Sequence, residues 1–400
     1  MRAEQYRSLD SDHTALAREL AAKFSERAAQ HDKENSFPFT DFEDMRQSGY
    51  LALTVPAELG GGGADLIRLC EAQEILAEGA PATALGVNMH LFTVGLAAEM
   101  WQDAKDEKLE VMLRAVTQGD LIVGSSISEA ETGGNNFRHA TTTAHRQDGG
   151  FVVNGRKIFC SLSPVMSGFA THALYQDPDE GPKIVHFMVF RDTPGLEIKD
   201  NWNAMGMRPT GSNDVSMTDV FVPDDFVVMQ RPAGVLDDFA IRAHRWFGLT
   251  FAAVYIGVAA GAYRYALRHA GERVRKPSVT PISHSPGVQF HAAEMEIALT
   301  AARSVVRQTA IELDAAPAAT ARQLAKVLVA KHIATENSVR VVDMAMSVLG
   351  GLGYLKRTPI ERLYRDVRAG KVHPPTGYDA LEIIGKAVLD IPLDVEPRWS

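Results

Sequence analysis

The stretch FVVNGRKIFC, Phe151–Cys160, places an Asn-Gly pair between two runs of β-branched, aromatic and other apolar residues. Asn and Gly both tolerate positive φ, so the pair predicts a β-hairpin with its turn at Asn154 and Gly155. Similar short segments surround it, and they include LIVGSSIS (121–128), KIVHFMVF (183–190) and NDVSMTDVFVP (213–223). We therefore predict a compact antiparallel β unit over residues 121–235.

The sequence on both sides of this β unit is helical. Residues 14–30, TALARELAAKFSERAAQ, repeat apolar side chains at the 3.6-residue spacing of an α-helix. Long amphipathic runs return at 288–314 and 320–351, with only short breaks between them. Such helices indicate an up-and-down bundle. The chain thus divides into a helical part (1–120), a β part (121–235) and a second helical part (236–400).

The composition is that of an ordinary globular protein and argues against several kinds of partner. Of 400 residues, 46% are hydrophobic and 23% are charged, and the net charge is −9. This charge gives no support to a nucleic-acid or anionic-membrane partner, and the charged N-terminus lacks the apolar stretch of a secretory signal. Cys70 and Cys160 form no CxxC motif and suggest a reducing compartment. We expect a cytoplasmic protein with no membrane span and no metal site.

Two polar, glycine-rich segments are candidates for the functional site. SSISEAETGGNN (125–136) follows a predicted strand, and LGGLGYLKRTPIERLYRD (349–366) ends a long helix. Taken alone, the second has a plain structural explanation: a helix C-cap with a turn, then an ion pair between Arg362 and Asp366 one helical turn apart. Short glycine motifs are weak evidence by themselves.

Taken together, five segments resemble the acyl-CoA dehydrogenase superfamily of flavoproteins. They occur in the family's order: VPAELGGGGAD (55–65), ISEAETGGN (127–135), NGRKIFCSLSP (154–164), WNAMGMRPTGSNDVSMTDVFVP (202–223) and GGLGYLKRTPIERLYRD (350–366). The resemblance implies an α+β, mainly α, fold with an N-terminal helical domain, a middle antiparallel β-barrel-like domain and a C-terminal four-helix bundle. It also implies FAD held between the middle domain and the bundle of a homotetramer or homodimer.

The same resemblance implies which residues contact the flavin. It places Ile127 and Ser128 beside the ring, and Phe159 and Ser161 against its other side, with the Ser161 hydroxyl near N5. Phe159 and the two serines also fit ordinary strand or turn positions. Gly350 and Gly351 of the 350–366 motif would let backbone N–H groups approach the pyrophosphate, as part of a neighbouring subunit's site. Together with one arginine and two further glycines, they complete the expected FAD-binding residues: Gly133, Gly134, Arg273, Gly350 and Gly351.

The segment KVHPPTGYDALEIIG (371–385) departs from the family where many members carry the catalytic base. The similar segment reads IYEGT in those members, and its glutamate falls on Pro374 of this chain. Proline has no carboxylate, and it lacks the N–H that would polarise a thioester carbonyl. A second base position used in the family falls on Phe247. A relocated base remains open, with three candidates: Asp379, Glu382 and Asp237.

A branch of the same superfamily, the reduced-flavin monooxygenases, needs no such base and uses a histidine near this segment. His373 occupies a comparable place, with Ser161 and His90 as candidate companions. Histidine suits this role because it exchanges a proton near neutral pH. Plain packing at a loop or on a helix face is the alternative for both histidines. The aromatic residue that follows the arginine at Arg273 in the family is missing, so FMN is the alternative cofactor.

Three functions remain open from the sequence. The breadth of the motif match favours α,β-dehydrogenation of an acyl thioester, CoA- or carrier-bound, with hydride transfer to flavin N5 and an electron-transfer flavoprotein as partner. The first alternative is a reduced-flavin, O₂-dependent monooxygenase that uses His373 and Ser161 on another small organic substrate, with a flavin reductase as partner. The second is a catalytically degenerate flavin-binding or assembly protein.

Overall fold

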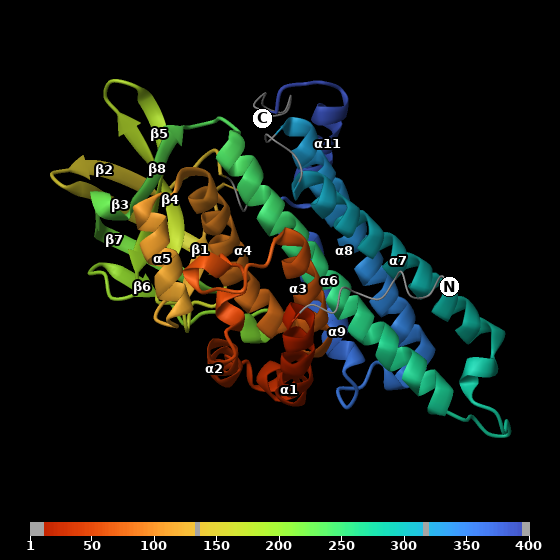
Figure 1. The fold of residues 1–400 in the computed structure, drawn as a ribbon. Helices are drawn as coiled ribbons and strands as arrows, with labels where there is room; N and C mark the ends of the chain where they lie inside the picture. Colours follow the sequence, from red (N-terminus) through yellow and green to blue (C-terminus); the bar gives the residue numbers. More distant parts are fainter. Residues whose placement is uncertain (1–11, 133–136, 315–319, 394–400) are drawn as a thin grey trace.

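The computed structural model describes residues 12–132, 137–314 and 320–393. Helices come first, strands next and helices last, which confirms the predicted α+β, mainly α, fold class (Figure 1). The first helices are α1 (Asp12–Glu34), α2 (Phe39–Gln47), α3 (Leu66–Gly79), α4 (Pro81–Ala104) and α5 (Glu107–Thr117). The strands are β1 (Val123–Ser126), β2 (Thr143–Gln147), β3 (Gly150–Cys160), β4 (Gly168–Asp177), β5 (Gly181–Phe190), β6 (Leu196–Ile198), β7 (Asn213–Pro223) and β8 (Val227–Pro232). The last helices are α6 (Asp238–Glu272), α7 (Pro286–Asp314), α8 (Ala321–Leu349), α9 (Ile360–Val367), α10 (Ala369–Val372) and α11 (Gly377–Val388).

The described strands form one sheet with the order β6-β7-β3-β2-β4-β5-β8, and β1 pairs with β4 beside this path. Most neighbours are antiparallel, as predicted, but β4 pairs in parallel with both β1 and β2. The Val123 N–H also donates to Nδ1 of His90 on α4, at 3.0 Å. Because β1 is tied to the sheet and to a helix, the residues that follow it, Ile127 and Ser128, leave the sheet at a fixed place beside the helices.

The predicted position of the hairpin turn is wrong, because the turn comes before β3 and not inside it. Gln147 pairs with Gly150, so the turn consists of Asp148 and Gly149, and Gly149 has a φ of +75°. Asp-Gly carries the same turn signal as Asn-Gly. Asn154 and Gly155 instead lie inside β3 at an irregularity in its pairing with β7. A Cβ at Gly155 would lie 2.5 Å from Oγ1 of Thr142, so close approach of another segment explains this glycine.

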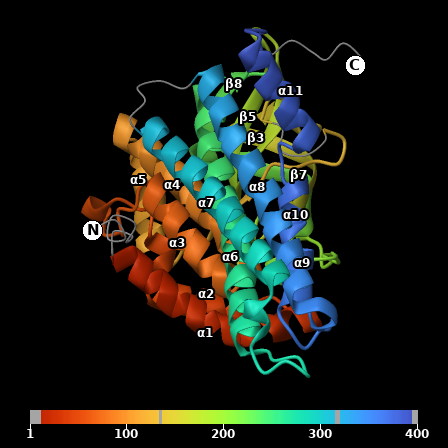
Figure 2. The same cartoon turned by 90° about the vertical axis from the view of Figure 1, so that its right-hand side faces the viewer.

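Helix α6 joins the N-terminal helices to the bundle. It packs with α7 and α8, while the shorter α11 lies beside α8 (Figure 2). It also crosses α3 closely, because a Cβ at Gly257 would lie 2.2 Å from the Glu74 carbonyl oxygen. By length and composition α6 could span a membrane, but 89% of its apolar window is buried inside the protein. Among the described helices it is thus explained as the central helix of the core.

Candidate active site

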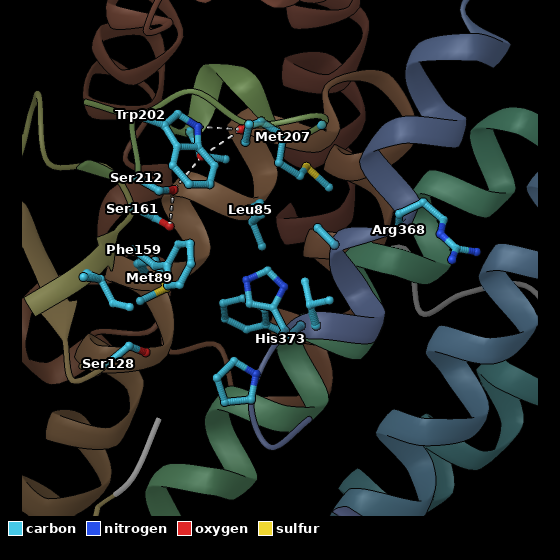
Figure 3. A pocket seen from close by; sticks show the side chains of 18 of the residues that line it. Leu85, Met89, Ser128, Phe159, Ser161, Trp202, Met207, Ser212, Arg368 and His373 are labelled. Carbon is cyan, nitrogen blue, oxygen red and sulfur yellow. Dashed lines mark hydrogen bonds between the residues drawn. The ribbon is translucent and has the colours of Figure 1, made fainter. Parts of the chain in front are cut away.

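A cavity of about 820 Å³ lies where the three parts of the chain meet. Helices α4 and α6 form one wall, the residues after β1 and at the end of β3 form another, and the segment 365–376 closes the third side (Figure 3). Ile127, Ser128, Phe159, Ser161 and His373 all line it. Segments far apart in the sequence therefore bring five of the predicted site residues to one cavity.

A row of hydroxyl groups lies along the sheet side of the cavity. Ser161 Oγ lies 2.8 Å from Ser212 Oγ, which lies 2.6 Å from Oγ1 of Thr210. Thr210 Oγ1 also lies 2.8 Å from the Met207 carbonyl oxygen, the acceptor at the end of the row. These contacts hold Ser161, which is 6% exposed, in a defined position at the cavity wall.

Two aromatic side chains stand next to these hydroxyls. Phe159 is 57% exposed and has a φ of +57°, an uncommon backbone conformation for a residue with a side chain. Its ring meets that of Trp202 edge to face, with centroids 6.0 Å apart. Trp202 is fixed by its own backbone N–H, which donates to Asn213 Oδ1 at 2.9 Å. The chain thus presents an aromatic ring to the cavity rather than burying it in the core.

Glu129 is the single carboxylate among the described residues that line the cavity. Its Oε1 lies 2.6 Å from Nζ of Lys157, and both side chains are fully buried. Thr141 and Thr142 donate four further hydrogen bonds, from their backbone N–H and hydroxyl groups, at 2.6–3.0 Å. Burial alone would raise the pKa of Glu129, but Lys157 and these donors lower it below its ordinary value. Glu129 is therefore a charged, fully paired structural group.

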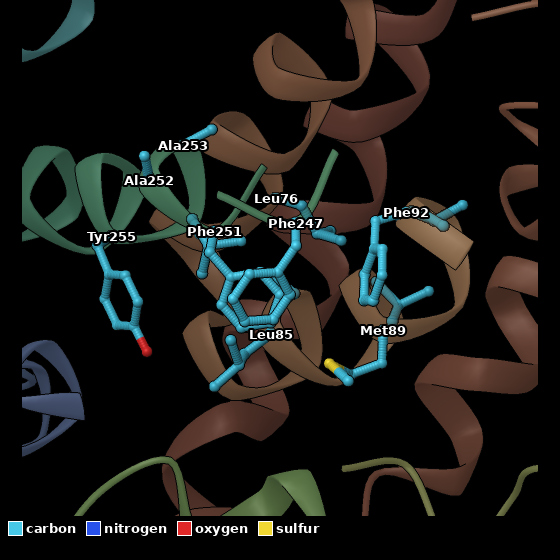
Figure 4. Close-up of a cluster of buried hydrophobic side chains, with 14 of the residues drawn as sticks. Leu76, Leu85, Met89, Phe92, Phe247, Phe251, Ala252, Ala253 and Tyr255 are labelled. Atoms are coloured by element: carbon cyan, nitrogen blue, oxygen red, sulfur yellow. The ribbon is translucent and has the colours of Figure 1, made fainter. Parts of the chain in front are cut away.

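The helical wall of the cavity is aromatic and aliphatic. The rings of Phe247 and Phe251 on α6 lie 4.2 Å apart, and Phe92 on α4 meets Phe247 edge to face at 5.5 Å (Figure 4). Leu85 and Met89 of α4 extend the same surface (Figure 4). The part of the cavity that faces these helices thus offers apolar contacts and no charge.

His373 lies at the junction of this apolar wall with the C-terminal segment. Its ring is 4.8 Å from that of Phe251, and its Nδ1 is in hydrogen-bond contact with the Tyr255 hydroxyl. Burial, helped by the charge of Lys331, lowers the pKa of His373 to about 3. Burial also raises the pKa of Tyr255 well above its ordinary value. At neutral pH both groups are uncharged, and the Tyr255 hydroxyl and Nδ1 of His373 can share one hydrogen bond.

Lys331 on α8 holds the backbone that carries His373. Its ammonium group donates to the carbonyl oxygens of His373 and of Pro375, the latter at 2.6 Å. Burial lowers the pKa of Lys331 to about 8.

Asp366 fixes the opposite side of the cavity, because its Oδ1 accepts from the Met207 N–H at 2.6 Å. Asp366 therefore holds the 202–212 loop and does not form the predicted ion pair with Arg362.

Three basic residues line the cavity near segment 365–376. Arg365 is paired with Asp32 at 2.7 Å, and Lys371 with Glu336 at 2.9 Å. Arg368 also lines the cavity and has no ion-pair partner among the described residues (Figure 3). Arg368 is thus the basic group at this side of the cavity that could attract a negatively charged group.

Several of the predicted site residues lie away from the cavity. His90 is fully buried and bridges two backbones, with Nε2 2.9 Å from the Leu51 carbonyl oxygen, so it packs as a structural histidine. Gly350 ends α8 with a φ of +60°, followed by Gly351, and Arg273 ends α6. None of these three lines the cavity of its own chain. Gly133 and Gly134 lie outside the described residues.

The three candidates for a relocated base have other partners. Asp379 bonds with Thr376 at 2.5 Å, Glu382 pairs with Lys386 at 2.5 Å, and Asp237 caps α6. None of them lines the cavity. Thr376 precedes α11 without capping it through its side chain, because the threonine hydroxyl bonds the Asp379 side chain instead of a backbone N–H. None of the described residues therefore presents a carboxylate with an unpaired oxygen to the cavity.

The sequence interpretation missed the residues that complete the walls. Trp202, Met207 and Ser212 lie in a segment that was matched only as a family motif. Phe92 and Phe251 were missed because an apolar residue on a helix has the same pattern whether it packs in the core or lines a cavity. A glycine-rich or polar signal at either place would have been needed to find them.

The cavity fits the flavin that the resemblance implies. An isoalloxazine ring has flat apolar faces and a polar edge, and Phe159 and Trp202 provide apolar surface beside the hydroxyls of Ser128 and Ser161. A cavity of this volume is within the usual range of ligand sites, about 300–1,000 Å³.

Replacing Ser161 with alanine should weaken flavin binding about fivefold, the loss of one ordinary hydrogen bond, and shift the visible spectrum of the bound flavin. Ser25→Ala is the matched control, since the Ser25 hydroxyl donates to the Ala22 carbonyl oxygen at 2.7 Å and does not line the cavity. Titration of both variants with FMN and FAD, followed by fluorescence, measures the effect. Equal affinities in both variants would remove Ser161 from the flavin site.

Comparison with known proteins identifies the family. Models of the N-terminal, middle and C-terminal domains of acyl-CoA dehydrogenases match residues 11–120, 124–220 and 249–376. The putative acyl-CoA dehydrogenase YdbM of Bacillus subtilis is 33% identical over 89% of this chain and 91% of its own. L-evernosamine nitrososynthase of a Micromonospora species is 29% identical over 93% of this chain and 88% of its own. The structure of KijD3, solved with FMN and a dTDP-linked amino sugar, has a TM-score of 0.87 at 30% identity, covering 98% of this chain and 97% of that one. The chain belongs to the acyl-CoA dehydrogenase family of flavin-dependent oxidoreductases.

Proposed function

We propose that this protein is a monooxygenase that uses a reduced flavin and O₂ to oxygenate a small organic substrate. The observation that carries the proposal is the pairing of Glu129, the only carboxylate among the described residues of the cavity. Abstraction of an α-proton needs a base within hydrogen-bond reach of the substrate. Glu129 has no unpaired carboxylate oxygen for that task, and the resemblance places Pro374 at the family's base position. Oxygenation by a reduced flavin does not need this base.

The relatives support an oxygenase as well as a dehydrogenase. KijD3 has been solved with FMN, and the Micromonospora relative is named a nitrososynthase. The relative from Bacillus subtilis is named a putative acyl-CoA dehydrogenase, which keeps the dehydrogenation favoured by the sequence as the second candidate. The oxygenase is the first candidate because Glu129 is fully paired and cannot act as the base.

A bound reduced flavin, FMN or FAD, would supply the electrons that activate O₂. Phe159 and Trp202 would contact its ring, and Ser128 and Ser161 would bond its polar edge. The apolar wall of Phe247 and Phe251 would exclude water from the opposite side. A flavin reductase is the expected partner. In the homotetramer or homodimer that we expect, Arg273, Gly350 and Gly351 would reach the cofactor of a neighbouring subunit.

His373 would hold a proton at the reacting side of the cavity. The Tyr255 hydroxyl is protonated at neutral pH, and when it donates to Nδ1, the hydrogen of the neutral imidazole lies on Nε2. A neutral Nε2–H can donate a hydrogen bond to an oxygen atom without adding a positive charge to an apolar wall. Lys331 keeps the ring in place by holding its backbone carbonyl.

Three measurements on purified protein separate the candidate functions. The cofactor is first identified, and the protein is then mixed with reduced FMN or reduced FAD in air and with a panel of acyl-CoA compounds without O₂. A monooxygenase binds the reduced flavin and alters its rate of O₂ consumption, and acyl-CoA does not bleach its oxidised flavin. Bleaching by an acyl-CoA would overturn the proposal in favour of dehydrogenation. A protein that binds neither flavin would be the degenerate assembly protein.

The contribution of His373 to turnover should not change between pH 5 and pH 7. Its folded pKa of about 3 lies below this range, so the imidazole stays neutral throughout, whereas an ordinary histidine would gain a proton below about pH 6.5. The ratio of wild-type to His373→Asn turnover, measured at saturating flavin and O₂, should therefore be constant over these pH values. A ratio that fell as the pH dropped through about 6.5 would show that His373 titrates normally.

A further inference from the structure

A second, smaller cavity of about 90 Å³ lies beside the first one. It is bounded by α4, α5, the strands β4, β5 and β8, and the start of α6, and α5 lies against the sheet at this place (Figure 1). Most of its lining is aliphatic, aromatic or thioether, including Leu96, Ala97, Met100, Leu109, Met112 and Phe187. The cavity is thus an apolar space too small for an organic substrate.

Three of the polar groups in this lining already have protein partners. The Thr93 hydroxyl donates to the Met89 carbonyl at 2.7 Å, and the Thr171 hydroxyl to the Ser126 carbonyl at 2.6 Å. His186 Nε2 accepts from Nε of Arg231 at 3.1 Å. A buried water needs about two to four polar partners, and apolar cavities without them stay dry and bind small apolar molecules or xenon. The cavity therefore favours a small, uncharged, apolar guest.

Phe92, Ser125 and Ile127 line both cavities. The wall between the two is thus no thicker than one residue, and Ile127 is a residue that we expect beside the flavin. At the other end Val228 lines the small cavity and is 40% exposed. The space therefore extends from near the protein surface to the back of the main cavity.

We propose that this small cavity is a binding site and entry route for O₂. The proposal rests on the proposed monooxygenase function, which makes O₂ a substrate. An apolar diatomic gas loses little by leaving water for a dry apolar space, whereas a charged or polar substrate would lose its hydration there. Side-chain motions at Ile127 and Phe92 would let the gas cross, while the main cavity stays open to the larger substrate.

Xenon is the direct probe of the site. Crystals of the full chain pressurised with xenon should show a peak in contact with Met112 and Phe187. Ala97→Leu should remove the peak, because the larger side chain fills the space. Absence of the peak in the unmodified protein would overturn the proposal.

Steady-state kinetics with reduced flavin at varied O₂ tests the route. Ala97→Leu, inside the cavity, and Val228→Trp, at its exposed end, should each lower kcat/KM for O₂ about tenfold with flavin affinity unchanged. The second variant keeps the test valid if the first does not fold. Ala22→Leu, at an exposed position on α1, is the matched control and should leave the O₂ kinetics unchanged.

The two proposals fail in different ways. If both variants keep the wild-type kcat/KM for O₂ although xenon binds, the entry route is overturned and the monooxygenase stands. If the unmodified protein consumes no O₂ with any reduced flavin, the proposed function fails, and the O₂ route fails with it even where xenon binds.

Discussion

Replacing His373 with alanine should lower the rate of substrate oxygenation at least about a hundredfold, the usual lower limit for the loss of a positioned proton donor or acceptor. The flavin should still bind, because the groups expected to contact its ring, Phe159, Ser161 and Trp202, lie across the cavity from His373 (Figure 3). The backbone should also persist, since Lys331 bonds the carbonyl oxygen of residue 373 and not its ring. The measurement is product formed per O₂ consumed, with reduced flavin supplied.

The control for this prediction is His284→Ala. His284 is an exposed histidine that does not line the cavity, so its replacement should leave turnover unchanged. Tyr255→Phe should cause a smaller loss than His373→Ala, because it removes only the partner that orients Nδ1. If His373→Ala retained full oxygenation, the histidine would be a packing residue. Acyl-CoA-dependent flavin reduction that persists in the same variant would favour the dehydrogenase instead.

The fold was predictable because its signals are local and repeated. Short β-type segments between long amphipathic helices gave the order of helix, sheet and helix without any knowledge of contacts. The turn at Asp148 and Gly149 was assigned to Asn154 and Gly155, since both dipeptides carry the same signal and only strand pairing distinguishes them. The parallel pairing of β4 with β1 joins segments distant in sequence, and no local pattern reports it.

The site was only partly predictable, for a related reason. His373 and Ser161 lie in motifs with polar or glycine-rich context, and the structure brings both to one cavity. Phe251 and Trp202 line the same cavity, but their sequence context does not separate a cavity wall from a core. Lys331 was missed because a lysine on a helix normally points to solvent, whereas here it is 4% exposed and bonds two carbonyl oxygens. Arg273 and Gly350 remain predictions, because their proposed role needs a second subunit.

Replacing Glu129 with glutamine should lower the free energy of unfolding by about 3–5 kcal/mol, the usual cost of removing one partner of a buried ion pair. The change leaves the ammonium group of Lys157 without its counter-charge at a site with no solvent exposure. The change also replaces one carboxylate oxygen with an amide NH₂ group. That group is a donor and cannot accept the hydrogen bonds that Thr141 and Thr142 donate from their N–H and O–H groups. Urea unfolding of wild type and variant, with equal slopes, measures the difference.

Two further variants test whether this loss comes from the buried charge. Glu43→Gln removes a carboxylate that is 44% exposed and pairs with Arg46, and a surface pair of this kind contributes little to stability, so the loss should be far smaller than in Glu129→Gln. The double variant Glu129→Gln with Lys157→Met should recover part of the stability, because it removes the unpaired charge as well. A loss in Glu129→Gln no larger than that in Glu43→Gln would contradict the structural role. Glu129 would then be free to exchange a proton in the cavity, and the main argument against dehydrogenation would be lost, because that argument depends on this carboxylate being fully occupied.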